Sequence, residues 1–208
     1  MERLPAAFYQ TEDVLGVARS LIGKLLVTKI NGVTTSGIIS ETEAYHESEK
    51  ACHAYNGRRT ERTRVLFEPG GTCYVYLCYG IHCLLNITTG DHRQAAAVLI
   101  RAIQPVQGLP HMMRRRRMEV LNTKVSAGPG MLTKALGITL RHNGECILNS
   151  KDLWIECYEN CSSDEITVSA RIGVDYAEED ALLPWRFFFK NNRWVSKTRT
   201  GILDGKIL

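Results

Sequence analysis

The stretch from Gly37 to Tyr45 reads Gly-Ile-Ile-Ser-Glu-Thr-Glu-Ala-Tyr, so it begins as an apolar strand and then introduces carboxylates. Side chains alternate between the two faces of a strand, and we therefore expect one face to carry Ile39, Glu41, Glu43 and Tyr45. The two glutamates would stand about 6.6 Å apart. A solvated strand end is the ordinary interpretation of two such glutamates. The neighbouring aromatic and a histidine eight residues later favour a functional site instead.

The composition is that of an ordinary globular protein, with 208 residues, 44% hydrophobic and 23% charged. This length predicts one domain spanning residues 1–208, with a substantial core. No run of about 18 apolar residues is present, which predicts that nothing spans a membrane. The first residues lack the layout of a secretory signal, so we expect an intracellular protein. The net charge of +4 is compatible with nucleic-acid binding.

The seven cysteines are an odd number and cannot all pair within the chain. Without a secretory signal, free thiols are the expected state. Cys73, Cys78 and Cys83 recur every five residues, which matches no zinc-binding spacing. The sequence suggests neither a metal site nor an organic cofactor.

Elements can be predicted on both sides of the opening stretch. Thr11 is expected to cap a helix that runs to about Ile22. Residues 24–30 have the pattern of a strand, and Asn31-Gly32 is a strong signal for a two-residue hairpin turn. The partner strand then covers residues 33–45, with the glutamates near its far end.

A second hairpin is predicted around Tyr79-Gly80, because strand-like residues flank this pair on both sides. An aromatic residue at a hairpin tip either packs under a loop or acts as a wedge that enters a partner. In the second strand Asn86 interrupts an apolar run, so if it is buried it must be hydrogen-bonded. Further strands are expected at 94–103, 153–158, 166–174 and 186–190. This order predicts an α+β domain around a mainly antiparallel, curved sheet with peripheral helices.

Two basic clusters stand out, Arg58 to Arg64 and Arg114 to Arg117. The first lies in a polar segment without periodicity, which we interpret as a functional loop. The second falls in a predicted helix over residues 110–121. Four successive helical positions spread over about 300°, so this run cannot form one face. Contact with phosphates and simple exposure to solvent both remain open for it.

Several segments together resemble one family. They are, in order, 21–27 (Leu-Ile-Gly-Lys-Leu-Leu-Val), 41–45 (Glu-Thr-Glu-Ala-Tyr) with His53, 71–76 (Gly-Thr-Cys-Tyr-Val-Tyr), Tyr79-Gly80 with Asn86-Ile87, 98–102 (Val-Leu-Ile-Arg-Ala), 171–174 (Arg-Ile-Gly-Val) and 194–196 (Trp-Val-Ser). Their order and spacing resemble the alkyladenine (3-methyladenine) DNA glycosylase family from about residue 11 to residue 196. The resemblance implies a monofunctional enzyme, acting as a monomer on double-stranded DNA, that excises damaged purines during base excision repair.

The resemblance also implies roles for individual residues. Such enzymes extrude the damaged nucleotide from the duplex before they act on it. Tyr79 matches the family's intercalating residue. The flipped base would stack between Tyr45 and His53, with Tyr76 lining the same pocket. Asn86 matches the residue that clashes with the amino group of undamaged guanine.

Glu43 matches the family's catalytic carboxylate, which would deprotonate an attacking water and stabilise an oxocarbenium-like sugar. Arg101 resembles the residue that helps to hold this water, and Ile172 would line the same corner through its backbone. Glu41 shares the motif, and we expect it to have a structural hydrogen-bonding role.

The basic loop of this family lies near the DNA, which implies phosphate contacts from Arg58, Arg62 and Arg64. This chain departs from a known form of the motif by placing Glu61 and Thr63 beside the middle arginine. A glutamate is unfavourable near phosphates unless it is paired, and Arg58 or Arg62 is the expected partner.

Three other interpretations remain open. A glycosylase with lyase activity would need a lysine amine as nucleophile, for which Lys50 is the candidate. A non-catalytic nucleic-acid-binding domain would have no need of Glu43. A sugar hydrolase with two carboxylates fits the spacing of Glu41 and Glu43 but explains neither Tyr79 nor the basic loop.

Overall fold

An eight-stranded antiparallel sheet forms the centre of the computed structural model, which describes residues 2–158 and 165–196. The strands are β1 (Leu25–Ile30), β2 (Val33–His46), β3 (Cys73–Cys78), β4 (His82–Thr88), β5 (Ala96–Gln107), β6 (Leu153–Glu156), β7 (Ile166–Ser169) and β8 (Arg186–Phe189). The prediction of an α+β fold around a mainly antiparallel sheet is therefore confirmed.

Short helices surround this sheet. The α-helices are α1 (Ala6–Tyr9), α2 (Val14–Ser20), α3 (Leu109–Arg116) and α4 (Pro129–Leu136). The 3-10 helices are η1 (Tyr55–Gly57), η2 (Arg64–Phe67), η3 (Thr123–Val125), η4 (Leu140–His142) and η6 (Asp175–Leu182). Over the described ranges of the chain, none of the helices has the length and apolar character needed to cross a bilayer.

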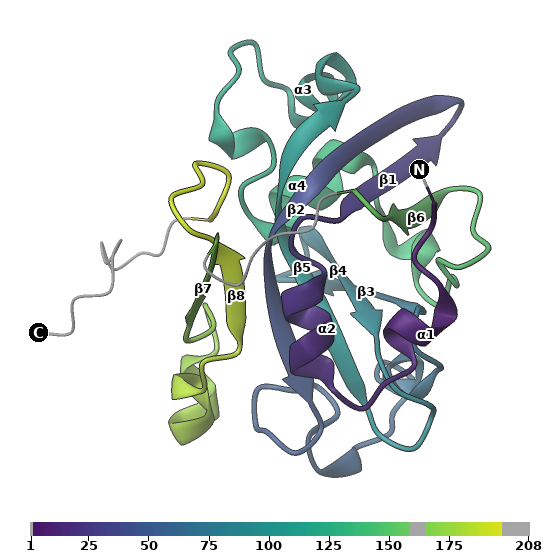
Figure 1. Ribbon diagram of the computed structural model, residues 1–208, viewed down its shortest axis with the longest axis vertical. Coiled ribbons are helices and arrows are strands. Elements are labelled where there is room, and N and C mark those ends of the chain that lie inside the picture. The colour runs from purple at the N-terminus through teal and green to yellow at the C-terminus, as the bar shows by residue number, and fades with distance from the viewer. Residues whose placement is uncertain (1, 159–164, 197–208) are drawn as a thin grey trace, which may run out of the picture.

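The strand β2, which contains the opening stretch, organises the sheet. Its first half pairs with β1, and its residues Glu41 to Glu43 pair with β8. On its other edge β5 accompanies it over most of its length, and β4 and β3 follow beyond β5. Figure 1 shows β2 and β5 crossing the middle of the molecule, with β7 and β8 on one side and β1 and β6 on the other. The strand β2 thus joins β5, β4 and β3 on one edge to β1, β6, β7 and β8 on the other.

The predicted alternation along β2 holds for the glutamates but is wrong for Ile39. The pairing register with β5 shifts on both sides of Glu41, as it does at a β-bulge. Ile39 is therefore opposite Ile103 and packs in the main core. Glu41 and Glu43, in contrast, both reach the guanidinium of Arg101.

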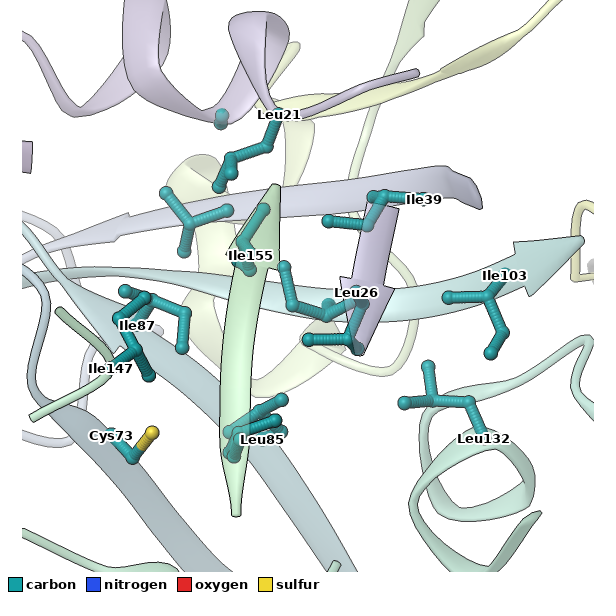
Figure 2. Packing of buried hydrophobic residues seen from close by; sticks show 14 of the residues in the cluster. Leu21, Leu26, Ile39, Cys73, Leu85, Ile87, Ile103, Leu132, Ile147 and Ile155 are labelled. Atoms are coloured by element: carbon teal, nitrogen blue, oxygen red, sulfur yellow. The ribbon is translucent and has the colours of Figure 1, made fainter. Parts of the chain in front are cut away.

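The main hydrophobic core includes side chains from the sheet and from α2 and α4. Figure 2 shows Leu21, which follows α2, and Leu132 of α4 near the sheet residues Leu26, Ile39 and Ile103. All five side chains are fully buried. Burial of each such side chain contributes about 1.5–3 kcal/mol. This core fixes β2 and β5, the two strands that carry the glutamates and Arg101.

The helix α2 differs from its prediction at both ends. Its N-cap is Asp13, whose carboxylate accepts a hydrogen bond from the amide of Gly16 at 2.8 Å, so the predicted cap at Thr11 is wrong. The helix also ends at Ser20, two residues before Ile22. Asp13 is the better placed of the two caps because it stands three residues before the amide that it satisfies.

The four-arginine run ends α3 and is partly used inside the fold. Arg115 donates to the carbonyl oxygen of Ala135 at 3.0 Å, and Arg116 donates to that of Lys124 at 3.0 Å. The first and last arginines of the run are exposed. The predicted helix is also shorter than expected, since α3 ends at residue 116 and Arg117 is left-handed with φ of 53°.

Candidate active site

A cavity of about 240 Å³ lies where the sheet meets the segments that follow β2 and β7. Its lining includes Tyr45, His53, Tyr76, Tyr79, Asn86, Arg101 and Ile172. Residues that are far apart in the chain, and that sequence reasoning placed in one site, therefore surround one space. A larger hollow of about 600 Å³ beside Arg64 and Asn143 is lined by neither the predicted catalytic residues nor those of the base pocket.

Aromatic rings form much of the cavity wall. The ring of His53 meets that of Tyr76 edge-on, with centroids 4.7 Å apart, and Tyr74 stacks on Tyr76 at 5.4 Å. The half-buried ring of Tyr45 contributes to the lining from β2. Tyr74 was not predicted, although it lies two residues before Tyr76 on the same strand, and the strand period would have identified it. The wall suits a flat, apolar ligand.

His53 is held as a neutral ring. Burial, aided by the nearby Arg62 guanidinium, lowers the pKa of His53 from 6.5 to about 4. Nη2 of Arg62 lies 3.4 Å from Nε2 of His53. Because a guanidinium only donates, Nε2 accepts, and Nδ1–H donates to the hydroxyl of Tyr74 at 2.9 Å. The ring therefore has a fixed tautomer and orientation at neutral pH.

Glu43 lies behind the cavity wall and is fully buried. Its Oε2 accepts hydrogen bonds from the hydroxyl of Tyr45 at 2.9 Å and from Nη1 of Arg101 at 3.0 Å. Its Oε1 accepts one from the backbone N–H of Ile172 at 2.7 Å. Burial and the adjacent carboxylate raise the pKa of Tyr45 well above its usual value, so this hydroxyl remains a donor. All three donors belong to residues that line the cavity.

Arg101 stands between two buried carboxylates. Besides its contact with Glu43, its Nε donates to Oε1 of Glu41 at 2.8 Å. Glu41 also accepts from Nε of Arg186 at 2.7 Å and from the backbone N–H of Ser196 at 2.7 Å. Two carboxylates and two guanidinium groups therefore balance one another in the interior, which is where unpaired charges are most costly. The expected hydrogen-bonding role of Glu41 fits these contacts.

Glu41 is also held in its ionised form. Burial alone would raise the pKa of Glu41, but Arg101, Arg186 and the hydrogen bonds from Ser196 together bring it below its usual value. A two-carboxylate sugar hydrolase requires one carboxyl group that keeps its proton at working pH. Glu41 cannot supply it, and Glu41 is not part of the cavity lining. The sugar-hydrolase interpretation is therefore disfavoured.

Asn86 presents its side chain to the cavity from β4. It is 5% exposed, and its Nδ2 donates to the carbonyl oxygen of Tyr74 at 3.2 Å. The expectation that a buried Asn86 is hydrogen-bonded is confirmed. This bond fixes the amide, so any base that enters meets a rigid polar group.

Tyr79 occupies the tip of the hairpin between β3 and β4. The side chain is 92% exposed, so the interpretation that it packs under a loop is wrong. Tyr79 and Gly80 both have positive φ, 49° and 72°, within the three-residue connection that joins the paired residues Cys78 and His82. The next residue, Ile81, is 72% exposed and was not singled out from the sequence. Two apolar side chains therefore project from the same tip.

The basic loop places its arginines at different distances from the cavity. Arg58, Arg62 and Arg64 are all exposed. Arg62 is closest to the cavity, with its guanidinium 5.4 Å from the ring centroid of Tyr76. Glu61 forms an ion pair with Nε of Arg64 at 2.8 Å, so the expected pairing with Arg58 or Arg62 is wrong. The i, i+3 spacing explains this, because residues three apart in a helical turn face one another.

Lys50 is poorly suited to act as a nucleophile. Its Nζ lies 2.5 Å from a carboxylate oxygen of Glu178 and 2.8 Å from one of Glu179. These hydrogen bonds raise the pKa of the Lys50 amine well above its usual value. A Schiff base forms only from a neutral amine. Lys50 also does not line the cavity.

A second buried ion pair supports the wall and was missed by sequence reasoning. Arg171 donates through Nη1 and Nη2 to the two carboxylate oxygens of Glu49, each at 2.8 Å. Its guanidinium also lies 4.8 Å from the ring centroid of Tyr45. Tyr176, likewise unpredicted, lines the cavity and donates from its hydroxyl to the carbonyl of Ala51. The spacing of these residues in the sequence gives no signal of their contact.

Comparison with known proteins gives a consistent result. The family model for methylpurine-DNA glycosylase matches residues 7–193. A Chlamydia felis protein named "Putative 3-methyladenine DNA glycosylase" is 46% identical over 186 residues, which cover 88% of this chain and 94% of the relative. Proteins of the same name from Clostridium botulinum and Clostridium perfringens are each 43% identical, over 91% and 94% of this chain and over 96% and 99% of their own lengths.

Proposed function

The chain belongs to the methylpurine-DNA glycosylase family, and on this basis we propose that it hydrolyses the bond between the deoxyribose and an alkylated or deaminated purine in duplex DNA. The product would be an abasic site, the first intermediate of base excision repair. The observation that carries the proposal is the arrangement of an aromatic cavity directly in front of a buried carboxylate, Glu43. In this proposal one molecule, acting as a single domain, performs the whole reaction.

The first step is extrusion of the nucleotide. An enzyme that acts on a base must take it out of the stack, which costs a few kcal/mol. Tyr79 is suited to fill the resulting gap because it is apolar, almost fully exposed and held at a tight tip. Side chains of this kind insert between base steps in minor-groove binders. Ile81 adds a second apolar surface beside it.

The second step is capture of the base. Tyr45 on one wall and His53 with Tyr76 on the other would stack on the faces of the purine. Base–aromatic stacking contributes about 1–3 kcal/mol per base and tolerates different purines. The neutral His53 ring favours this role, since its low pKa keeps a positive charge away from cationic alkylated bases. Asn86, fixed by its bond to Tyr74, would exclude bases with an amino group at that edge.

The third step is hydrolysis. A water molecule would enter beside Arg101 and Ile172, which line the cavity and contact Glu43. Glu43 takes a proton as the water oxygen bonds to C1′ of the sugar. The C1′–N bond breaks, and its electrons leave with the alkylated purine. Assistance by a general base contributes about 10²–10⁴-fold in rate.

DNA binding would rest on the basic loop. Arg58, Arg62 and Arg64 are exposed and follow β2, close in sequence to the cavity residues. Contacts with phosphates position a protein without reading sequence, as suits a search for rare lesions. The contact of Arg62 with Tyr76 links this loop to the cavity rim.

The test uses duplexes that each contain one ethenoadenine, hypoxanthine, 3-methyladenine or 7-methylguanine. After incubation and hot alkali, we expect strand breaks at the lesion with the wild-type protein and a loss of about 10²–10⁴-fold with Glu43→Gln. Breaks that appear without alkali, together with a DNA adduct trapped by borohydride, would indicate lyase chemistry. DNA that is bound but never cleaved, for all four lesions, would leave only a binding module.

A further inference from the structure

Two buried carboxylates share Arg101, and the proposed reaction uses only one of them. Glu43 is in contact with three residues of the cavity lining. Glu41 is in contact with one residue of that lining, Arg101, through the same guanidinium. The charge of Glu41 can therefore act on Glu43 through Arg101.

We propose that Glu41 is a positioning residue that draws Arg101 to one side and balances the local positive charge, so that Glu43 can still accept a proton. This inference rests on the proposed function. It assigns to Glu41 an effect on the protonation chemistry of Glu43 that is separate from its effect on folding.

The contacts of Arg101 support this role. Its Nε donates to Glu41 at 2.8 Å, its Nη2 lies 3.4 Å from the hydroxyl of Ser196, and its Nη1 alone donates to Glu43, at 3.0 Å. An arginine and a carboxylate frequently pair through two parallel hydrogen bonds. Here Nε is directed to Glu41 and Nη2 to Ser196, so only Nη1 reaches Glu43. One oxygen of Glu43 therefore remains free of Arg101.

The charges around Glu43 support the proposed role of Glu41 in balancing the local positive charge. Arg101 faces it from β5 and Arg186 from the paired position on β8, and Arg171 lies next to Ile172. The neighbouring groups of β2 are the hydroxyl of Tyr45 and Glu41 itself. Glu49 balances Arg171 through a two-bond ion pair. Glu41 is thus the carboxylate that balances Arg186 and shares Arg101.

Without the charge of Glu41, Glu43 would face the guanidinium groups of Arg101 and Arg186 with no second carboxylate to balance them. Nearby positive charges favour the ionised form of a carboxylate and make it a weaker base. The rate of a general-base reaction falls with the basicity of the base. Removal of the charge should therefore move the acidic limb of the pH–rate profile to lower pH and lower the plateau.

The experiment measures single-turnover excision of ethenoadenine from duplex DNA between pH 4.5 and 8.5, for the wild type, Glu41→Gln and Glu43→Gln. For Glu41→Gln we expect the acidic limb to move down by about one pH unit and the plateau to fall about tenfold. Affinity for the lesion duplex should stay within about threefold, because Glu41 does not line the cavity. A role in folding alone would not move the limb.

Two further variants keep the test decisive. Glu41→Asp retains the charge but withdraws the carboxylate from Arg101, so the plateau of the pH–rate profile should fall while its acidic limb stays in place. This variant provides a test even if Glu41→Gln does not fold. Glu49→Gln removes an equally buried, arginine-paired carboxylate that does not contact Arg101. It controls for general destabilisation, and we expect its limb to move less than that of Glu41→Gln, because Arg101 donates to Glu43 directly whereas Arg171 donates to Glu49 and to backbone carbonyls.

The outcomes separate the two proposals. An inactive wild type, or an active Glu43→Gln, would overturn the proposed function. An active wild type and an inactive Glu43→Gln, combined with wild-type rates and limbs in both Glu41 variants, would overturn only the role of Glu41. An equal displacement of the limb in Glu49→Gln would also overturn it, because the effect would then not depend on Arg101.

Discussion

Two regions serve one proposed reaction but are built in opposite ways. One is the floor, by which we mean the buried charged residues at and behind the cavity wall (Glu41, Glu43, Glu49, Arg101 and Arg171). The other is the tip of the β3–β4 hairpin. On the floor, Glu41 and Glu43 are fully buried, and each accepts hydrogen bonds from several partners. At the tip, Tyr79 and Ile81 are exposed and project away from the fold. The floor must hold charges in fixed positions. In the proposed reaction, the tip must leave its apolar surface available to DNA.

This contrast has an energetic consequence. Buried charges are stable only while each retains its partners, so a change on the floor should affect folding and activity together. The exposed side chains of the tip contribute little to the fold, so a change there should affect activity alone. Variants of the two regions can therefore be compared by measuring the free energy of unfolding and the excision rate side by side.

The largest effect on folding is expected from Arg171→Met. Arg171 pairs with Glu49 through two hydrogen bonds and is almost fully buried. Removing one partner of a buried ion pair leaves an unpaired charge and costs about 3–5 kcal/mol. Denaturant unfolding would measure the loss.

The double variant Arg171→Met/Glu49→Gln is the matched control, because it removes both charges. It should be more stable than the single variant. A single variant that loses less than about 1 kcal/mol would show that the floor depends on packing instead of on this ion pair.

A smaller effect on folding is expected from pH, through His53 in the cavity wall. Its pKa is 6.5 in the unfolded chain and about 4 in the fold. Between these values the unfolded chain binds more protons, so stability is present above pH 6.5 and is lost as the pH falls toward 4. The loss should be at most about 3 kcal/mol.

His53→Gln is the control, since it removes the titrating group but keeps a polar side chain. The difference in unfolding free energy between this variant and the wild type should change only between pH 6.5 and 4. An NMR titration that placed the pKa of His53 near 6.5 would contradict both the burial and the neutral stacking ring.

Much of the fold could be predicted from local patterns. The Asn31-Gly32 turn, the strands β1 and β2 and the hairpin at Tyr79 follow from residue types that favour those structures in isolation. The bulge beside Glu41 could not be predicted, because it depends on how β2 and β5 align. It is nevertheless the bulge that separates Ile39 from the glutamates.

The residues of the candidate site also differ in how well the sequence predicted them. Its cavity residues were found through the resemblance to a family, and the strand period alone would have added Tyr74. The buried pairs of Arg171 with Glu49 and of Arg186 with Glu41 join residues more than 100 positions apart. Only the folded sheet brings them together. Residues that line the cavity were therefore easier to predict than the residues that support them.

At the tip, Tyr79→Ser should separate activity from stability. The unfolding free energy should change by no more than about 0.5 kcal/mol. Excision from a duplex should fall about 10–100-fold, since the wedge offsets an unstacking cost of a few kcal/mol. Ile81→Ser tests the neighbouring side chain in the same way.

A single-stranded substrate with the same lesion is the control for this variant. It needs no wedge, so the wild type and Tyr79→Ser should excise its lesion at similar rates. If Tyr79→Ser loses as much stability as Arg171→Met, the tip is part of the core and the contrast with the floor does not hold.

The smallest effect is expected from the basic loop, which lies outside both regions. Arg58→Gln removes one exposed positive charge, so the logarithm of DNA affinity should fall less steeply with the logarithm of salt, by about 0.9 in slope. Affinity should weaken equally for damaged and undamaged duplexes, because phosphate contacts carry no information about the base. Arg141→Gln, an exposed arginine paired with Asp152 outside this loop, should leave the slope unchanged. An unchanged slope in both variants would show that Arg58 does not contact phosphate. A loss of affinity confined to damaged DNA would show that this arginine acts on the base in the cavity and not on the DNA backbone.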